Sequence, residues 1–136
     1  MNRLVVTSFC LGFVFFAGSA FVQAYSLPKS IEKGKEVYTT FCQNCHMENG
    51  LGLAGTYPPL AKSDYLKHPV NELISIVLKG QVGKIKVNGI TYDSPMLPLD
   101  YLTDEQIADA LNYSRNSWGN KNTIAVLPAQ VKKLRN

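Results

Sequence analysis

The chain has 136 residues, of which 46% are hydrophobic and 18% are charged. This length suits one domain with a single core and excludes two domains of ordinary size. The charged fraction argues against a disordered chain, and a net charge of +4 is too small to indicate a nucleic-acid partner.

Residues 1–24 are typical of a secretory signal peptide. An uncharged apolar stretch follows Arg3, and small residues ending at Ala24 form a cleavage site. We therefore predict an exported, periplasmic protein whose mature chain begins at Tyr25 and keeps no membrane span. An earlier cleavage site remains an alternative, as does an uncleaved anchor over residues 4–22 that would hold the protein at the membrane.

The three cysteines of the chain divide between the signal and the mature protein. Cys10 lies inside the predicted signal, so the mature chain keeps Cys42 and Cys45. Cysteines of exported proteins are normally paired or consumed by chemistry. Cys42 and Cys45 therefore mark the region in which a functional site is expected.

The first predicted helix of the mature chain runs directly into Cys42. Ser30 is a suitable N-cap, and apolar or small residues then recur at spacings of three and four. These residues are Ile31, Gly34, Val37, Tyr38 and Phe41. Residues 48–59 are rich in glycine and proline, which predicts a loop that wraps another group.

The middle of the chain predicts a helix, a hairpin and a stiff loop. Pro69 suits the first residue of a helix that stops at Gly80. Residues 84–87 and 90–92 flank an Asn-Gly pair, the strongest short-range signal for a β-hairpin. Residues 94–98 then form a loop, because two prolines fix their own φ angles.

A further helix is predicted from Thr103. Thr103 and Gln106 form a capping box, while Leu102 and Ile107 form a hydrophobic staple across the helix start. We expect Gly119 to end this helix. Its apolar stripe is Ile107, Ala110, Leu111 and Ser114.

The chain closes with a basic segment. Residues 121–136 contain several lysines and one arginine, and Pro128 can start a brief helix there. We therefore predict three parts, which are a signal peptide over residues 1–24, a domain over residues 25–120 and a basic C-terminal tail over residues 121–136.

The decisive motif is Cys42, Cys45 and His46. Two thiols separated by two residues can each add to a vinyl group of a haem, and the following histidine then lies beneath the iron. Thioether bonds hold the macrocycle permanently, and His46 offers a neutral imidazole as the proximal ligand. The motif predicts one covalently attached haem c.

Three other interpretations of these cysteines remain. A structural zinc site would need a fourth ligand, for which the mature chain offers only His68 and carboxylates. A catalytic dithiol would be expected beside a βαβ pattern, which is absent from the sequence. A simple disulfide leaves the long loops unexplained.

Met96 is the predicted distal ligand of the iron. It lies in the proline-stiffened loop, far enough along the chain to reach the opposite face of a haem. A thioether raises the reduction potential relative to a second imidazole. The alternatives are that His68 takes this position or that no side chain does.

With these residues, the chain resembles class I cytochrome c, in particular the single-haem domains of bacterial periplasmic electron carriers and dehydrogenase cytochrome subunits. Gly34, Tyr38 and residues 42–46 match the N-terminal helix and attachment motif of that family, and Tyr113 matches the aromatic residue of its C-terminal helix. The resemblance implies an all-α cytochrome c fold in which the two terminal helices cross, with a small β-hairpin and haem-wrapping loops.

The same resemblance assigns roles in the loop after the motif. Residues 57–60 match a family loop in which a proline carbonyl accepts a hydrogen bond from the proximal imidazole and a leucine packs on the ring. By position, these residues are Pro58 and Leu60. Such a hydrogen bond orients the imidazole and makes it a better donor to iron.

The predicted function is single-electron transfer. An iron with His46 and Met96 in its axial positions has no vacancy for a substrate, so we expect a carrier and not an enzyme. Its partners would be redox proteins such as a periplasmic dehydrogenase, reductase or terminal oxidase, with the carrier itself a monomer or a subunit of a complex. The alternatives are a tightly bound dehydrogenase or reductase subunit, and a haem enzyme or gas sensor in which Met96 dissociates.

Overall fold

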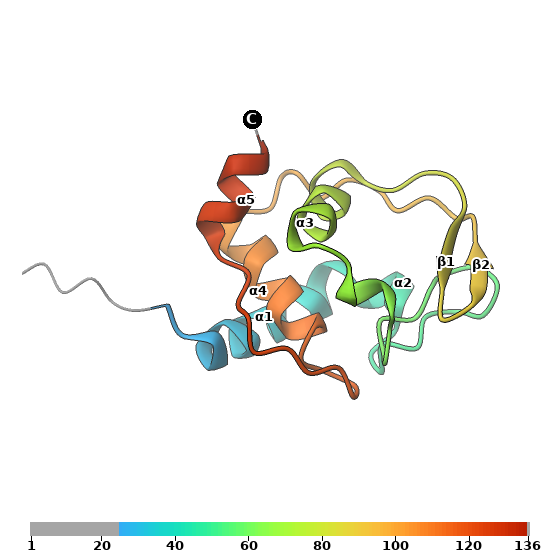
Figure 1. The fold of residues 1–136 in the computed structure, drawn as a ribbon, viewed down its shortest axis with the longest axis horizontal. Coiled ribbons are helices and arrows are strands. Elements are labelled where there is room, and N and C mark those ends of the chain that lie inside the picture. The colour runs from blue at the N-terminus through green and yellow to red at the C-terminus, as the bar shows by residue number, and fades with distance from the viewer. Residues whose placement is uncertain (1–24, 136) are drawn as a thin grey trace, which may run out of the picture.

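The structure is a computed structural model that describes residues 25–135 (Figure 1). The predicted signal peptide, with Arg3 and Cys10, lies outside the described residues. None of the helices within residues 25–135 is both long and apolar enough to cross a bilayer. The elements of this part of the chain are α1 (Leu27–Phe41), α2 (Gln43–His46), the 3-10 helix η1 (Tyr65–Lys67), α3 (Val70–Lys79), β1 (Ile85–Val87), β2 (Ile90–Tyr92), α4 (Asp104–Ser114) and α5 (Pro128–Arg135).

The predicted fold class is confirmed, because the described chain is mainly helical with one small antiparallel sheet. α4 packs across α1 with its backbone against Gly34, which is buried (Figure 1). Glycine has no Cβ, so the backbones of two helices can approach closely at this position. The contact joins the first and fourth α-helices of the described chain.

A buried polar network lies beside this helix contact. The Ser30 hydroxyl donates to the Asp109 carboxylate, and the Asn112 amide donates to the Ser30 hydroxyl over 2.9 Å. The same Asn112 side chain exchanges two hydrogen bonds with the backbone of Val126, and its amide also donates to the Tyr25 hydroxyl over 3.0 Å. Residues near both ends of the described chain therefore meet at Asn112.

Two predicted helix boundaries are wrong. α1 begins at Leu27 with Ser26 in the N-cap position, so Ser30 is not the cap. Ser30 is instead 3% exposed inside the polar network. α4 ends at Ser114 with Arg115 as its C-cap, so Gly119 does not end this helix. Gly119 lies in a later turn, where it adopts a left-handed φ of 88°.

The start of α4 follows the prediction closely. The Thr103 hydroxyl accepts a hydrogen bond from the Gln106 amide over 3.1 Å, and the Gln106 side chain accepts one from the Thr103 amide over 2.9 Å. Leu102 and Ile107 are both buried in the main core. The apolar cluster at this core joins α1, α3, α4 and α5.

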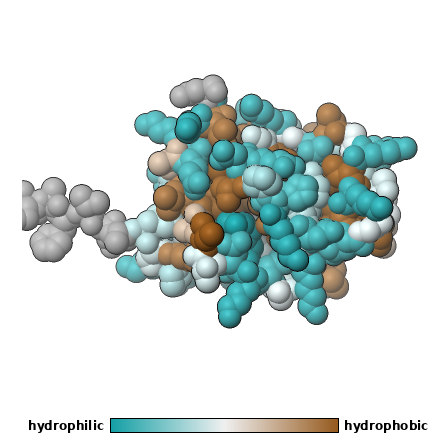
Figure 2. All heavy atoms as spheres, viewed as in Figure 1, coloured by the Kyte–Doolittle hydropathy of each residue, from teal (hydrophilic) through white to brown (hydrophobic). Residues whose placement is uncertain are grey.

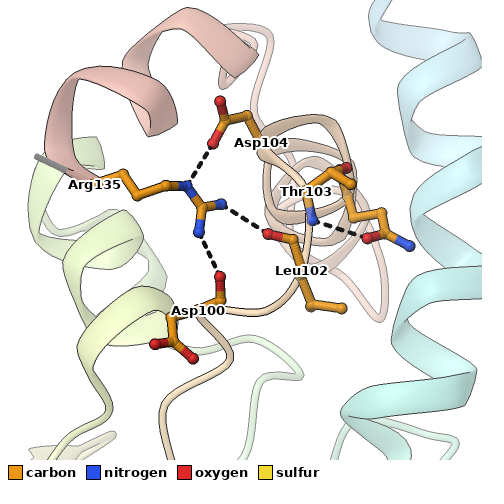
Figure 3. Close-up of polar contacts among 6 residues, drawn as sticks. Asp100, Leu102, Thr103, Asp104 and Arg135 are labelled. Atoms are coloured by element: carbon orange, nitrogen blue, oxygen red, sulfur yellow. Dashed lines mark hydrogen bonds and ion pairs between the residues drawn. The ribbon is translucent and has the colours of Figure 1, made fainter.

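The predicted tail packs onto this same core. Val126 and Val131 are fully buried among the residues of the main cluster. At the end of α5, Arg135 donates to the Asp104 carboxylate over 2.9 Å and to the Leu102 carbonyl over 2.7 Å, and it also bonds the Asp100 carbonyl (Figure 3). One guanidinium thus fastens α5 to the segment that leads into α4.

The helix and hairpin of the middle region are also close to their predicted positions. α3 begins at Val70, one residue after its predicted start, with Pro69 in the N-cap position, and Gly80 ends it with a φ of 76°. β1 pairs with β2 around the Asn-Gly turn, in which both residues have positive φ, as a type I′ hairpin turn requires. Asp64 and Asn88 exchange two backbone-to-side-chain hydrogen bonds of 2.8 and 3.0 Å, which anchor the hairpin tip.

Candidate haem site

The attachment motif lies where α1 ends and α2 begins. Cys42 is the C-cap of α1, and its amide donates to the Tyr38 carbonyl over 2.9 Å. α2 then carries Cys45 and His46, and the His46 amide donates to the Cys42 carbonyl over 3.0 Å. Both cysteines are free thiols, with Cys42 half-buried and Cys45 exposed. Two thiols and one imidazole are therefore presented within a single turn.

The environment of Cys42 disfavours the dithiol interpretation. Burial and, to a smaller extent, the neighbouring Cys45 together raise the pKa of the Cys42 thiol to about 11. Catalytic dithiols rely on a thiol whose pKa is depressed, because the thiolate is the nucleophile. Cys42 remains protonated at neutral pH and lacks this property.

His46 is oriented by the loop that follows it. Its Nδ1 lies 3.0 Å from the Pro58 carbonyl oxygen, as expected. A carbonyl can only accept, so Nδ1 carries the hydrogen and Nε2 keeps its lone pair. Burial lowers the pKa of His46, against the opposing effect of this hydrogen bond, which favours the neutral imidazole. A neutral, oriented imidazole with a free Nε2 is suited to bind a metal.

The glycine-rich loop is held by contacts that sequence reasoning missed. The Tyr38 hydroxyl donates to the Met47 carbonyl over 2.6 Å, immediately after His46. Gly50 lies against the indole of Trp118, and its carbonyl accepts hydrogen bonds from the amides of Leu60 and Ala61. Nothing in the loop's own composition signals these contacts, because the partner side chains come from α1 and from the turn after α4.

The remaining two predicted residues lie in different surroundings. Leu60 is half-buried and packs against the main hydrophobic cluster. Met96 is half-buried and forms an isolated β-bridge with Gln81, through two backbone hydrogen bonds of 2.9 Å. A side chain at Gly80 would lie 2.5 Å from the Met96 carbonyl oxygen, so the chain is closely packed there. The bridge to Gln81, which the sequence does not signal, fixes the Met96 loop to the end of α3.

His68 is engaged elsewhere. Its Nδ1 lies 2.9 Å from a carboxylate oxygen of Glu72, and its ring stacks on Tyr65 with 4.2 Å between centroids. The side chain is exposed. This placement matches the surface position of a helix-start residue and gives no support to His68 as an iron ligand.

Several large apolar side chains of the loops remain exposed in the protein chain alone. Leu51 is 59% exposed in the loop after the motif, while Val82 and Leu97 are 80% and 76% exposed on either side of the hairpin. Figure 2 shows hydrophobic atoms at the surface over the end of the molecule that carries β1 and β2. Isolated exposed apolar residues are ordinary, but three large ones in the loops that follow the motif and flank the hairpin fit a chain that wraps an apolar group.

Comparisons with known proteins agree with this chemistry. The model of the cytochrome c family matches residues 31–118. A cytochrome c-552 from Thermus thermophilus is 33% identical over 133 residues, covering 92% of this chain and 84% of the relative. A second cytochrome c-552 from Thermus thermophilus is 36% identical, covering 75% of this chain and 83% of the relative. The cytochrome c subunit of the quinone alcohol dehydrogenase from Gluconacetobacter polyoxogenes is 33% identical, covering 75% of this chain but only 22% of that subunit.

Proposed function

The chain belongs to the cytochrome c family, whose members carry covalently bound haem c, and from this premise we propose that it is a periplasmic single-electron carrier with His46 and Met96 as axial ligands. Haem c supplies an iron that gains and loses one electron. In this proposal, Cys42 and Cys45 form the thioether bonds to the macrocycle.

The single observation that carries the proposal is the hydrogen bond between His46 and Pro58. It commits Nδ1 as a donor and leaves Nε2 available, beside the thiols of Cys42 at the C-cap of α1 and Cys45 in α2. A carbonyl acceptor on the imidazole increases its electron donation to a metal. The chain therefore presents an oriented proximal ligand next to its points of attachment.

The proposed distal ligand is supported by its backbone restraint. The two hydrogen bonds between Met96 and Gln81 hold the backbone of the ligand loop in one position. Such restraint lowers the conformational entropy that must be lost when a flexible thioether binds. With both axial positions taken by protein side chains, the iron would exchange electrons without binding a substrate, which is why we propose a carrier and not an enzyme.

A second candidate function is a bound cytochrome subunit of a dehydrogenase. It is favoured by the likeness to the cytochrome c subunit of a quinone alcohol dehydrogenase, of which this chain spans 22%. Under either function, we expect protein redox partners and no nucleic acid. The periplasmic location rests on the predicted signal peptide.

The deciding experiment is optical spectroscopy of the exported, haem-loaded protein. We expect ferric wild type to show the weak near-infrared band of methionine sulfur bound to iron, and Met96→Ala to lose it. Met47→Ala is the matched control and should retain the band, because Met47 adjoins His46 on the proximal side. His68→Ala should retain it as well.

Two results would contradict this assignment. A wild-type protein that lacks the band and readily binds carbon monoxide would move the haem enzyme or gas sensor forward. A band that survives in Met96→Ala would remove Met96 as the ligand. Sedimentation of the mature protein separates the free carrier from the bound subunit. A protein that sediments as a monomer, and whose haem is reduced no faster when a large co-purifying partner is present, favours the free carrier.

A further inference from the structure

A basic pocket lies away from the haem motif, between the start of η1 and the turn that follows α4. Its volume is ≈ 340 Å³, at the lower end of the range for small-molecule sites. It does not include Cys42, Cys45, His46, Pro58 or Met96. The residues that line it are Lys62, Ser63, Leu66, Lys67, Arg115, Gly119, Asn120, Lys121 and Asn122.

The pocket carries strong positive charge. Lys62, Lys67 and Lys121 are exposed at its rim, and Arg115 belongs to its wall. No aspartate or glutamate is among the lining residues. Four cationic groups therefore share one pocket without an acidic side chain to balance them.

Arg115 is the unusual member of this set. It is only 6% exposed, and no ion pair to it is found within residues 25–135. Its Nη1 donates to the Ile124 carbonyl over 3.1 Å, but its buried Nε has no hydrogen-bond partner in this part of the chain. Burial lowers the pKa of Arg115, yet a guanidinium stays charged at neutral pH. A buried charge without a counter-charge is costly.

A second buried donor shares the pocket. Ser63 is 2% exposed, and its hydroxyl likewise has no partner within the described residues. A buried polar group with unused hydrogen-bonding capacity lowers the stability of the folded protein. An anion that enters the pocket offers acceptors to both donors once their side chains turn toward it.

We propose that this pocket binds a phosphate group, either as inorganic phosphate or as a small phosphate monoester. Phosphate carries about 1.5 to 2 negative charges at neutral pH and has several acceptor oxygens, so it balances the cluster better than a single carboxylate. Arginine and lysine together are the usual side chains for this ligand. The site is separate from the residues of the proposed haem function, so the two proposals fail independently.

The test is a titration of the reduced, haem-loaded protein, followed by 1H–15N NMR at pH 7 and constant ionic strength. Inorganic phosphate and glycerol 3-phosphate are added separately, with sodium chloride as the ionic-strength reference and succinate as the carboxylate probe. We expect saturable shifts at the Ser63 and Asn120 amides and at the Arg115 Nε–H with at least one phosphate probe. The tighter of the two identifies the source of the phosphate group.

Paired lysine variants make the test specific. Lys67→Gln/Lys121→Gln removes two exposed pocket charges and should weaken phosphate binding about tenfold, as expected for two modest charge contacts. Lys132→Gln/Lys133→Gln removes two exposed charges from α5, so its binding should change less than about twofold. Both pairs alter surface side chains, so we expect both proteins to fold.

Three outcomes would overturn the proposal. The first is that sodium chloride causes the same NMR chemical shift changes as phosphate, which would show that the changes follow ionic strength alone. The second is an equal loss of affinity in the two double variants. The third is tighter binding of succinate than of either phosphate compound.

Discussion

The α-carbon of Gly34 on α1 faces the backbone carbonyl of Asp109 on α4 so closely that no Cβ fits between them. A Cβ at residue 34 would overlap that carbonyl oxygen and lie 2.8 Å from the Cβ of Tyr113. The ring of Tyr113 packs beside this contact against Tyr38 and Trp118, at centroid distances of 5.4 and 5.2 Å. The backbone contact therefore determines the distance between the two helices, and aromatic rings pack beside that contact.

Gly34→Ala should destabilise the fold strongly. The added methyl group must separate α1 from α4 or strain them, which we expect to lower the free energy of unfolding by about 2 kcal/mol or more. Urea denaturation of the haem-loaded protein measures this change. Lys35→Ala, at an exposed position of the same helix, should stay within about 0.5 kcal/mol of wild type. Equal stability of the two variants would show that α1 and α4 can separate freely.

A comparison of two loop glycines tests the orientation of His46. A Cβ at Gly52 would lie 2.7 Å from the Pro58 carbonyl oxygen, whereas a Cβ at Gly55 meets no atom within 4 Å. Both residues have positive φ, so each alanine variant carries a similar backbone strain of about 1 kcal/mol. Only Gly52→Ala should displace the carbonyl and speed solvent exchange of the His46 Nδ1 proton, as seen by NMR. Equal exchange in both variants would contradict the proposed role of the loop.

Asp109 should make stability depend on pH. Burial raises the pKa of its carboxyl, against the lowering effects of the Ser30 and Tyr25 hydrogen bonds and of Lys33, while Glu105 raises it further. A folded-state pKa above the unfolded value of about 3.9 contributes stability that is present below pH 3.9 and is lost as pH rises through the folded value. Asp109→Asn should therefore gain stability relative to wild type as pH rises from about 4 to neutrality.

Urea denaturation across this pH range measures the effect of Asp109. Asp93→Asn, at an exposed aspartate, is the control, and its stability difference from wild type should vary much less with pH. A difference for Asp109→Asn that stays constant with pH would rule out the expected titration.

Arg135 should stabilise α5 through the geometry of its guanidinium. Three separate acceptors bind its nitrogens, an arrangement that a lysine ammonium on a flexible stem cannot reproduce (Figure 3). Arg135→Lys and Arg135→Gln should both increase amide exchange across α5, and the lysine variant should recover little of the loss. Lys133→Gln, exposed on the same helix, should leave the exchange rates unchanged. Full recovery by lysine would show that charge alone fastens the helix.

The features that sequence reasoning predicted well are those determined by nearby residues. The capping box joins Thr103 and Gln106, which are three positions apart, and the hairpin turn at Asn88 is set by its own backbone preference. Ser30 was assigned wrongly because its role depends on Asp109, which is 79 positions away. The local pattern predicts an N-cap, but a contact with a residue far along the chain decides the role of Ser30, and no sequence pattern reveals that contact.

The site divides in the same way. The attachment motif is contiguous and could be identified directly, and the carbonyl of Pro58 followed from a family resemblance. The bridge between Met96 and Gln81 could not be predicted, because its hydrogen bonds are made by backbone atoms and carry no residue preference. The contact between Gly50 and the indole of Trp118 likewise joins a loop to a turn that is distant in the sequence, so it could not be predicted either.

The hydrogen bonds of Asn112 have a mechanical consequence. Tyr25 and Val126, near the two ends of the described chain, both bond to this one side chain, and Arg135 is fastened to the segment before α4. A stretching force applied to residues 25 and 135 would therefore load the contacts of α1, α4 and α5 before it reached the loops between them. The loops around His46 and Met96 should keep their conformation until the contacts among α1, α4 and α5 break.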